Sequence, residues 1–258
     1  KYGISDLGYL EDIDKITAKG LYEHYVNIMK TSPIDIVVEG NFDEDEIVEI
    51  ISNGFDFHRE NIIEIPRADF IKKVDEIKVI KEEMDITQGK LVMGYRCNVD
   101  YKDEFKYYSL FVGSNVLGGG PHSKLFVNVR EKESLCYYIY SSLEKYKTSM
   151  FISSGIESEN YDKTVELIGE QLKSLKEGKI SDEELLNSKS AIISSLKTIK
   201  DSLGGSSDFY FSQSMGGTNT TVEKIIEMIE KVTVSDIVEA FKNIELDTIY
   251  FLSNNKEA

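Results

Sequence analysis

An arginine and a tyrosine with six residues between them offer the clearest chemistry in this sequence. Arg130 and Tyr137 lie on either side of a predicted helix-to-strand connection, so one extended ligand could reach both. The guanidinium is a permanent cation whose planar fork donates to carbonyls or carboxylates. The phenol is a neutral donor that can stabilise a developing oxyanion. From the spacing alone, a surface arginine in an ion pair and a core tyrosine are the more ordinary explanation of the two residues.

Three consecutive glycines, Gly118, Gly119 and Gly120, come shortly before this pair and predict a turn. The sequence GGGPHSK looks like a phosphate-binding loop, but that motif requires glycine immediately before its lysine. Here Ser123 occupies that position. The acidic balance of the chain also disfavours an anionic ligand, so we do not expect nucleotide binding at this turn.

Zinc and nucleophilic catalysis are both disfavoured by the residues present. A helical zinc peptidase needs two histidines one turn apart with a nearby carboxylate. This chain has only His24, His58 and His122, so neither HExxH nor HxxEH occurs and no metal ligands are predicted. Ser134 and Cys136 lie near the glycine turn, but no spacing suggests a His–Asp relay that would activate them.

Composition limits the classes of function further. The 258 residues carry a net charge of −16 without a basic patch, so a nucleic-acid surface is not expected. No apolar run approaches the roughly 20 residues that a membrane span needs. Cys97 and Cys136 lie far apart and form no CxxC motif, which favours two reduced, buried thiols. Reduced thiols suit a reducing compartment, and we expect a cytoplasmic protein.

The first 57 residues read as the tail of a domain that begins outside this sequence. Thr17 can cap a helix whose Leu21, Tyr25, Ile28 and Met29 share one side, residues 34–38 form a short buried strand, and Asp43 starts a second helix that ends at Gly54. Since the chain starts with Lys1, we expect a longer parent protein. Residues 58–75, with Pro66 and little periodicity, are predicted to link this tail to a second domain.

Residues 76–258 are predicted to form the C-terminal domain, with an α+β fold. Strands cluster first and helices follow, which favours an antiparallel-rich sheet with helices packed on one face. Gly204 and Gly205 are expected to break the long helix that Ser181 and Glu184 begin as a capping box. The predicted strands are residues 77–83, 91–97, 135–143, 150–156 and 248–252, and the predicted helices are 103–117, one from Ser123, one from 161 to Gly178, one from Ser181 to 199, and two around 225–229 and 237–241.

The segment LGGGPHSKLFVNVREKESLCYY, residues 117–138, resembles the C-terminal half of the pitrilysin/insulinase peptidases, which include mitochondrial processing peptidase. ISDLGYLEDIDKITAKGLYEHYVNIM, IDIVVEGNFDEDEI and QGKLVMGYR resemble the same family in the same order. The resemblance therefore covers nearly the whole chain and implies the family's α+β fold. The sequence SLCYY is most similar to bacterial members described as inactive partners of a zinc-bearing sister chain.

The resemblance implies a role in peptide binding. In that family two similar halves enclose a chamber, one half binds zinc, and the other contributes an Arg–Tyr pair that contacts the substrate backbone. Arg130 and Tyr137 match that pair, while the three glycines and Ser123 match the segment leading into it, so these residues are expected to bind substrate. Zinc is expected in a partner half, within the same longer chain or in a sister subunit, and this chain alone is expected to be inactive. A scaffolding subunit and a stand-alone peptide-binding module remain as alternatives.

Overall fold

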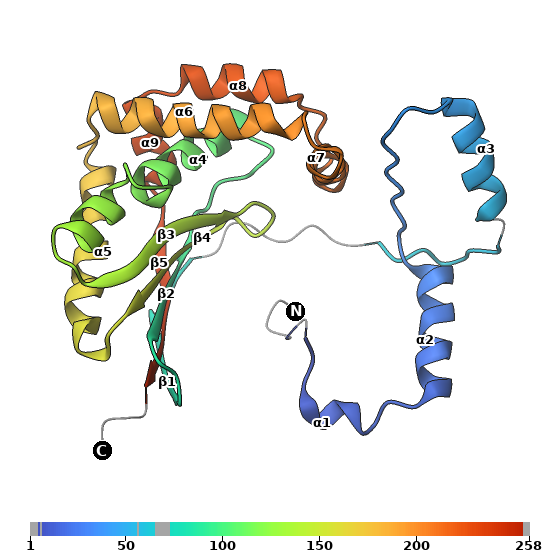
Figure 1. The fold of residues 1–258 in the computed structure, drawn as a ribbon, viewed down its shortest axis with the longest axis horizontal. Helices are drawn as coiled ribbons and strands as arrows, with labels where there is room; N and C mark the ends of the chain where they lie inside the picture. The colour runs from blue at the N-terminus through green and yellow to red at the C-terminus, as the bar shows by residue number, and fades with distance from the viewer. Residues whose placement is uncertain (1–4, 6, 56, 65–72, 255–258) are drawn as a thin grey trace. The chain divides into compact units, whose positions relative to one another are not determined.

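The computed structural model describes residues 5, 7–55, 57–64 and 73–254, and the chain divides into two compact units, Lys1–Arg67 and Ala68–Ala258 (Figure 1). Unit 1 contains α1 (Leu10–Ile13), α2 (Ala18–Thr31) and α3 (Glu44–Gly54). Thr17 caps α2 by accepting from the backbone N–H of Gly20, and Asp43 caps α3 by accepting from that of Glu46. Both predicted helix starts are therefore confirmed. The predicted junction at 58–75 lies partly outside the described residues.

The strand predicted at residues 34–38 is wrong, because this segment forms no strand in the structure. A strand needs a neighbour for its backbone hydrogen bonds, and the described residues of unit 1 contain no other strand. Ile36, Val37 and Val38 are therefore 45%, 41% and 43% exposed rather than buried. The apolar sides of α2 and α3 are also open, since neither helix contains a buried residue.

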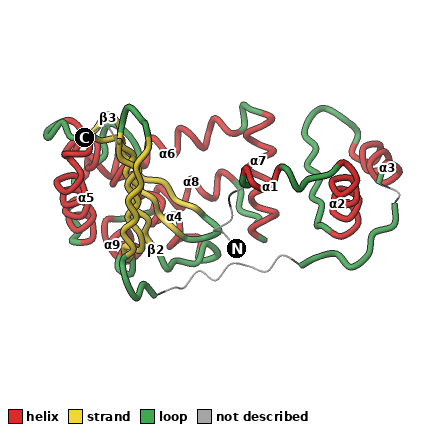
Figure 2. The backbone as a smooth tube through the Cα atoms, turned by 90° about the horizontal axis from the view of Figure 1, so that it is seen from below, coloured by secondary structure: helices red, strands yellow, loops and turns green. Residues whose placement is uncertain are grey.

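Unit 2 is built on a five-stranded sheet in the order β1-β5-β2-β4-β3. Its strands are drawn in yellow in Figure 2. β1 pairs with β5 in parallel, whereas the β5–β2, β2–β4 and β4–β3 pairs are antiparallel. The predicted antiparallel-rich sheet is thus confirmed. β1 and β2 are consecutive in sequence, yet β5 lies between them. The strands are β1 (Lys78–Met84), β2 (Gly89–Arg96), β3 (Cys136–Glu144), β4 (Ser149–Ile156) and β5 (Glu245–Asn254).

The core of unit 2 lies between one face of this sheet and the helices (Figure 1). Alternate residues of β2, namely Leu91, Met93 and Tyr95, are at most 3% exposed, while Lys90 on the other face is exposed. This two-residue period is the pattern of a sheet covered on one side only. The α+β fold with helices on one face is therefore confirmed.

The helices of unit 2 follow the predicted order with one addition. The break after the long helix α6 falls before Gly204 and Gly205, so their predicted role as the break is wrong. Ser202 caps the new helix α7 by accepting from the backbone N–H of Gly205, and both glycines occupy its first turn. The helices are α4 (Glu104–Gly118), α5 (Tyr161–Lys176), α6 (Asp182–Ile199), α7 (Leu203–Gly216), α8 (Val222–Lys231) and α9 (Val234–Phe241), with a π-helical segment Phe126–Glu131 and a 3₁₀ turn Ser158–Asn160.

Candidate functional site

Arg130 is carried by a π-helical segment, Phe126–Glu131, which continues a helical turn that begins at Lys124. The backbone N–H of Lys132 donates to the carbonyl of Val127 at 3.1 Å, which is the i to i+5 bond of a π-helix. Such segments are rare and occur frequently at functional sites. The widened turn therefore marks this part of unit 2 as a candidate site.

The guanidinium of Arg130 rests on an aromatic ring four residues earlier on the same segment. Its central carbon lies 4.6 Å from the centroid of the Phe126 ring, a cation–π arrangement. The side chain is half-buried. Within the described part of the chain, no acidic side chain forms an ion pair with it and no acceptor hydrogen-bonds to it. The donors of this cation are therefore available to a ligand.

Tyr137 projects from a second irregularity, at the start of β3. The register between β3 and β4 shifts between Cys136 and Tyr138, so Tyr137 is the extra residue of a β-bulge. Its side chain is 64% exposed, and its hydroxyl donates to Oε1 of Glu157 at 3.3 Å. Glu157 directly follows β4, so strand pairing brings it opposite the bulge.

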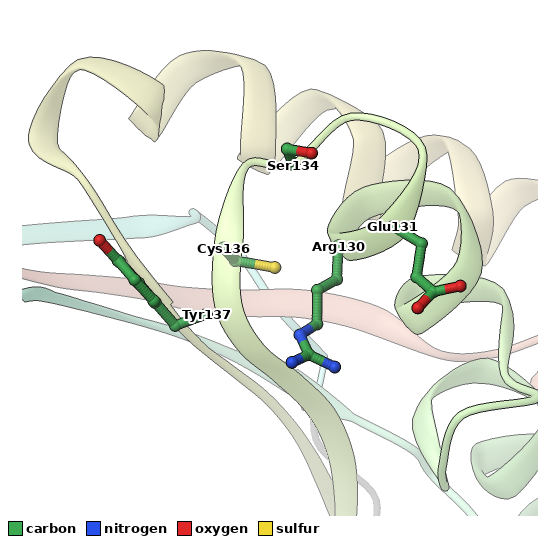
Figure 3. Close-up of a pocket in the computed structure, with 5 residues that line it drawn as sticks. All are labelled: Arg130, Glu131, Ser134, Cys136 and Tyr137. Atoms are coloured by element: carbon green, nitrogen blue, oxygen red, sulfur yellow. The ribbon is translucent and has the colours of Figure 1, made fainter.

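A cavity of about 350 Å³ lies where the π-helical segment meets β3. Figure 3 shows its lining: the Arg130 side chain descends on one side of the strand, and the Tyr137 ring points away on the other. The two side chains thus come from adjacent elements without converging. Ser134 turns the chain between them in the left-handed region, with φ of 54°, a strained conformation for a residue with a side chain. The cavity is lined by Arg130, Glu131, Ser134, Cys136 and Tyr137.

The thiol of Cys136 is the neutral nucleophile of this cavity. Burial raises its pKa above the ordinary value, and a hydrogen bond with Ser154 and the nearby charge of Arg130 offset only part of that rise. The side chain is 9% exposed and forms no disulfide. Together with Cys97, which is fully buried, it confirms the prediction of two buried, unpaired thiols.

The predicted binding residues of the glycine turn do not line this cavity. Gly118 is buried at the end of α4, and a Cβ there would lie 2.5 Å from the backbone nitrogen of Ser141, so glycine lets α4 approach β3 closely. Gly119 is exposed and Gly120 is half-buried. Ser123 is fully buried, and its hydroxyl has no hydrogen-bond partner within the described residues. The turn therefore packs α4 against β3, and its predicted contact with substrate stays a prediction.

Two polar contacts fasten this turn to α6. Nζ of Lys124 donates to both carboxylate oxygens of Glu184, at 2.9 and 3.1 Å. Nε2 of His122 lies 3.2 Å from Oδ1 of Asn115 and 3.1 Å from Oγ of Ser188. The histidine that lies nearest the site in sequence thus links α4 to α6. These contacts hold the segment that leads to Arg130 in one position.

Among the residues that the structure describes, no group of three or more His, Cys, Asp or Glu side chains is placed to hold a metal ion. His24 and His58 lie in unit 1, and His58 is 3.5 Å from Glu60. No described helix combines the length and apolar composition that crossing a bilayer requires.

Sequence reasoning missed part of this site. Glu131 and Phe126 had no distinguishing spacing, and Glu157 is twenty positions from Tyr137 in the sequence. The predicted pairing of residues 135–143 with 150–156 could have identified Glu157, since it places the residue after β4 beside the start of β3. The bulge and the π-helical turn left no sequence pattern that we recognised.

Comparisons with known proteins show the family of this chain. The family model of the peptidase M16 inactive domain matches residues 15–192. The Bacillus subtilis protein named "Probable inactive metalloprotease YmfF" is 35% identical over 257 residues, which cover 100% of this chain and 60% of that protein. The resemblance to the non-zinc half of a zinc-peptidase family is therefore confirmed.

Solved structures give the same result for the fold. A conserved protein from Enterococcus faecalis superposes with a TM-score of 0.87 at 30% identity, over 99% of this chain and 60% of that one. A protease from Helicobacter pylori, at 18% identity, shares the fold with a TM-score of 0.74 over 95% of this chain and 61% of its own. The chain thus spans about three fifths of the length of these relatives. It belongs to the family of peptidase M16 inactive domains.

Proposed function

We propose that this chain is the substrate-binding, non-catalytic half of a zinc peptidase that acts on peptides. The observation that carries the proposal is the half-buried guanidinium of Arg130, which has no acidic partner in the described residues and lines a cavity beside Tyr137. A cation that is held by an aromatic ring and left without a partner is prepared for a ligand. The cavity opens next to β3, so an extended ligand could pair with this strand and also reach into the cavity.

The peptide would bind along β3, which is the last strand of the described sheet. An edge strand offers backbone donors and acceptors to an added chain, so affinity comes from main-chain hydrogen bonds. Arg130 would donate to the peptide at one end of this strand. Tyr137 would turn from Glu157 and donate its hydroxyl to the carbonyl of the bond to be cut, where a fixed donor stabilises the developing charge.

Hydrolysis itself requires a second half. A zinc ion in that partner half would supply an activated water molecule. The partner would be either a segment of the same longer protein or a sister subunit. The role of the present chain is then to hold the peptide in an extended conformation and to position one carbonyl.

The test replaces Arg130 and measures cleavage with the zinc-bearing partner present. Arg130→Ala is expected to lower kcat/KM by about tenfold to a hundredfold, because a charge-assisted hydrogen bond contributes about 1.5–3 kcal/mol. Lys132→Ala is the matched control, since the exposed side chain of this neighbour bonds only to Oδ1 of Asn128 within the described residues. Cleavage by Arg130→Ala at the wild-type rate would contradict the proposed role.

A scaffolding subunit is the second candidate. The divergence of Arg130 and Tyr137 in Figure 3, and the engagement of Tyr137 with Glu157, favour it. Isothermal titration calorimetry distinguishes the two functions. A scaffolding subunit would bind no peptide, either alone or with its partner, and would change cleavage only by changing how well the partner is assembled.

A further inference from the structure

The chemistry of Arg130 defines the ligand more closely than the proposed function requires. The other arginines of the described residues are already engaged. Nε of Arg96 donates to Oδ2 of Asp247 at 2.7 Å, and Arg59 donates to the carbonyls of Met29 and Ser32. Arg130 has only the face of the Phe126 ring. Among the described arginines, Arg130 is thus the one whose guanidinium has neither an acidic partner nor a hydrogen-bond acceptor.

The ring of Phe126 orients this cation before any ligand arrives. The ring of Phe126 occupies one face of the guanidinium, so its in-plane donors are left for the cavity. Two parallel N–H donors match the two oxygens of a carboxylate, whereas a single carbonyl oxygen uses only part of the fork. A carboxylate also brings a negative charge to pair with the guanidinium, which has no acidic partner in the described residues.

The other residues that line the cavity do not neutralise the positive charge of Arg130. Ser134, Cys136 and Tyr137 are uncharged, and burial keeps the thiol of Cys136 protonated by raising its pKa. Glu131 lines the same cavity but is exposed, and it forms no ion pair with Arg130 in the described structure. Its carboxylate adds some repulsion toward an anion, which provides a second residue for a test.

We propose that Arg130 binds a carboxylate of the peptide ligand, supplied either by the peptide's C-terminus or by an acidic side chain. The inference rests on the proposed function, because it assumes that a peptide binds along β3, and it names the group that the peptide presents to the cavity. A peptide with no carboxylate near the strand's start is then a poor ligand, even if its backbone pairs well with β3.

Fluorescence anisotropy with three forms of one probe tests this. The probe is Val-Thr-Val-Thr-Val-Ala with an uncharged BODIPY label at its N-terminus and a free C-terminus, the same labelled peptide as the C-terminal amide, and that amide with one threonine replaced by aspartate. The full 258-residue chain is used. At least one carboxylate form is expected to bind about tenfold more tightly than the neutral amide, and which form does so identifies the source of the carboxylate.

Variants assign this preference to the cavity. Arg130→Gln is expected to remove the preference, and Arg130→Lys to keep only a small part of it, because lysine has the charge without the fork. Glu131→Gln is expected to tighten binding of the carboxylate peptide and leave the amide unchanged. Lys132→Gln is the control for a nearby positive charge and is expected to change neither.

Two results would overturn the inference about the carboxylate, and a third would also overturn the proposed function. Equal binding of all three peptides to the wild type, with a loss in Arg130→Gln, would show that the arginine serves a carbonyl and would leave the proposed function intact. A carboxylate preference that persists in Arg130→Gln would assign it to another cation. Failure of every peptide to bind would contradict the proposed function itself.

Discussion

The ion pair between Lys124 and Glu184 should decide how firmly the glycine turn is held. Nζ of Lys124 donates to both carboxylate oxygens, and the side chains of Lys124 and Glu184 are 8% and 23% exposed. Glu184 also accepts from the backbone N–H of Ser181 at 2.8 Å, as part of the capping box of α6. Lys124→Met removes the cation and keeps most of the apolar stem.

The expected loss follows from this geometry. Removing one partner of a buried pair costs about 3–5 kcal/mol, because the other charge stays buried without compensation. Glu184 keeps the Ser181 donor and is partly accessible to water, so the loss of unfolding free energy should be about 2–3 kcal/mol. In a domain of this size, each kcal/mol corresponds to roughly 2–4 °C in Tm, so Tm should fall by about 4–12 °C.

The same pair makes stability depend on pH. Burial raises the pKa of Glu184, but the backbone N–H of Ser181 and the ammonium of Lys124 lower it by more, so its pKa lies below the ordinary value. A carboxyl group with a lowered pKa stabilises the fold above its unfolded pKa of about 4.3, and that contribution is lost as pH falls through the folded pKa. The difference between wild type and Lys124→Met should therefore be largest near neutral pH and shrink below about pH 4.

Thermal unfolding followed by circular dichroism measures both effects. Lys224→Met is the matched control, because its pair with Glu227 spans 3.1 Å between side chains that are 59% and 54% exposed. An exposed pair of this kind contributes under about 1 kcal/mol. Equal Tm values for Lys124→Met and the wild type at neutral pH would refute the reasoning, as would a difference that stays constant down to pH 3.

Three further predictions concern packing, thiols and metal. Gly113→Ala should destabilise unit 2 by about 1–3 kcal/mol in urea, because its Cβ would lie 2.7 Å from Ile237 and closer to Phe241; exposed Gly169→Ala in α5 should instead stabilise it by about 0.5–1 kcal/mol. Burial raises the pKa of Cys97 to about 12, so a thiol reagent should label the native protein only at its other cysteine. Metal analysis of the purified chain should find no stoichiometric zinc, and tightly bound zinc would contradict its assignment as the non-zinc half.

Local signals in the sequence predicted most of unit 2. The capping box at Ser181 and the apolar period of α5 depend on residues within one or two turns, so the sequence carries them completely. The strands of the β3–β4 pair were also predicted, because each alternates and a short turn joins them. The signals for these elements are local, while their stability comes from packing into the core of unit 2.

Pairing between distant strands was not predicted. The strand predicted at 77–83 is confirmed as β1, but its parallel partner β5 lies 170 residues later in register, and no local pattern indicated that pairing. The segment at 34–38 has a stronger apolar composition but finds no strand to pair with in the described part of unit 1. Apolar composition therefore reports the capacity to pair, and the presence of a neighbouring strand decides whether a strand forms.

The candidate site shows the same limit at the scale of one side chain. Six residues between Arg130 and Tyr137 predict that both are near one ligand, and the structure places them on adjacent elements around one cavity. The direction in which each side chain points depends on the local backbone geometry, and the number of residues between the two does not determine that geometry. The π-helical turn presents the guanidinium on one side of β3, and the bulge turns the phenol to the other, where Glu157 holds it. A ligand that engages both residues must therefore break the bond to Glu157, so Glu157→Gln should strengthen peptide binding if Tyr137 takes part, and should leave it unchanged if Arg130 acts alone.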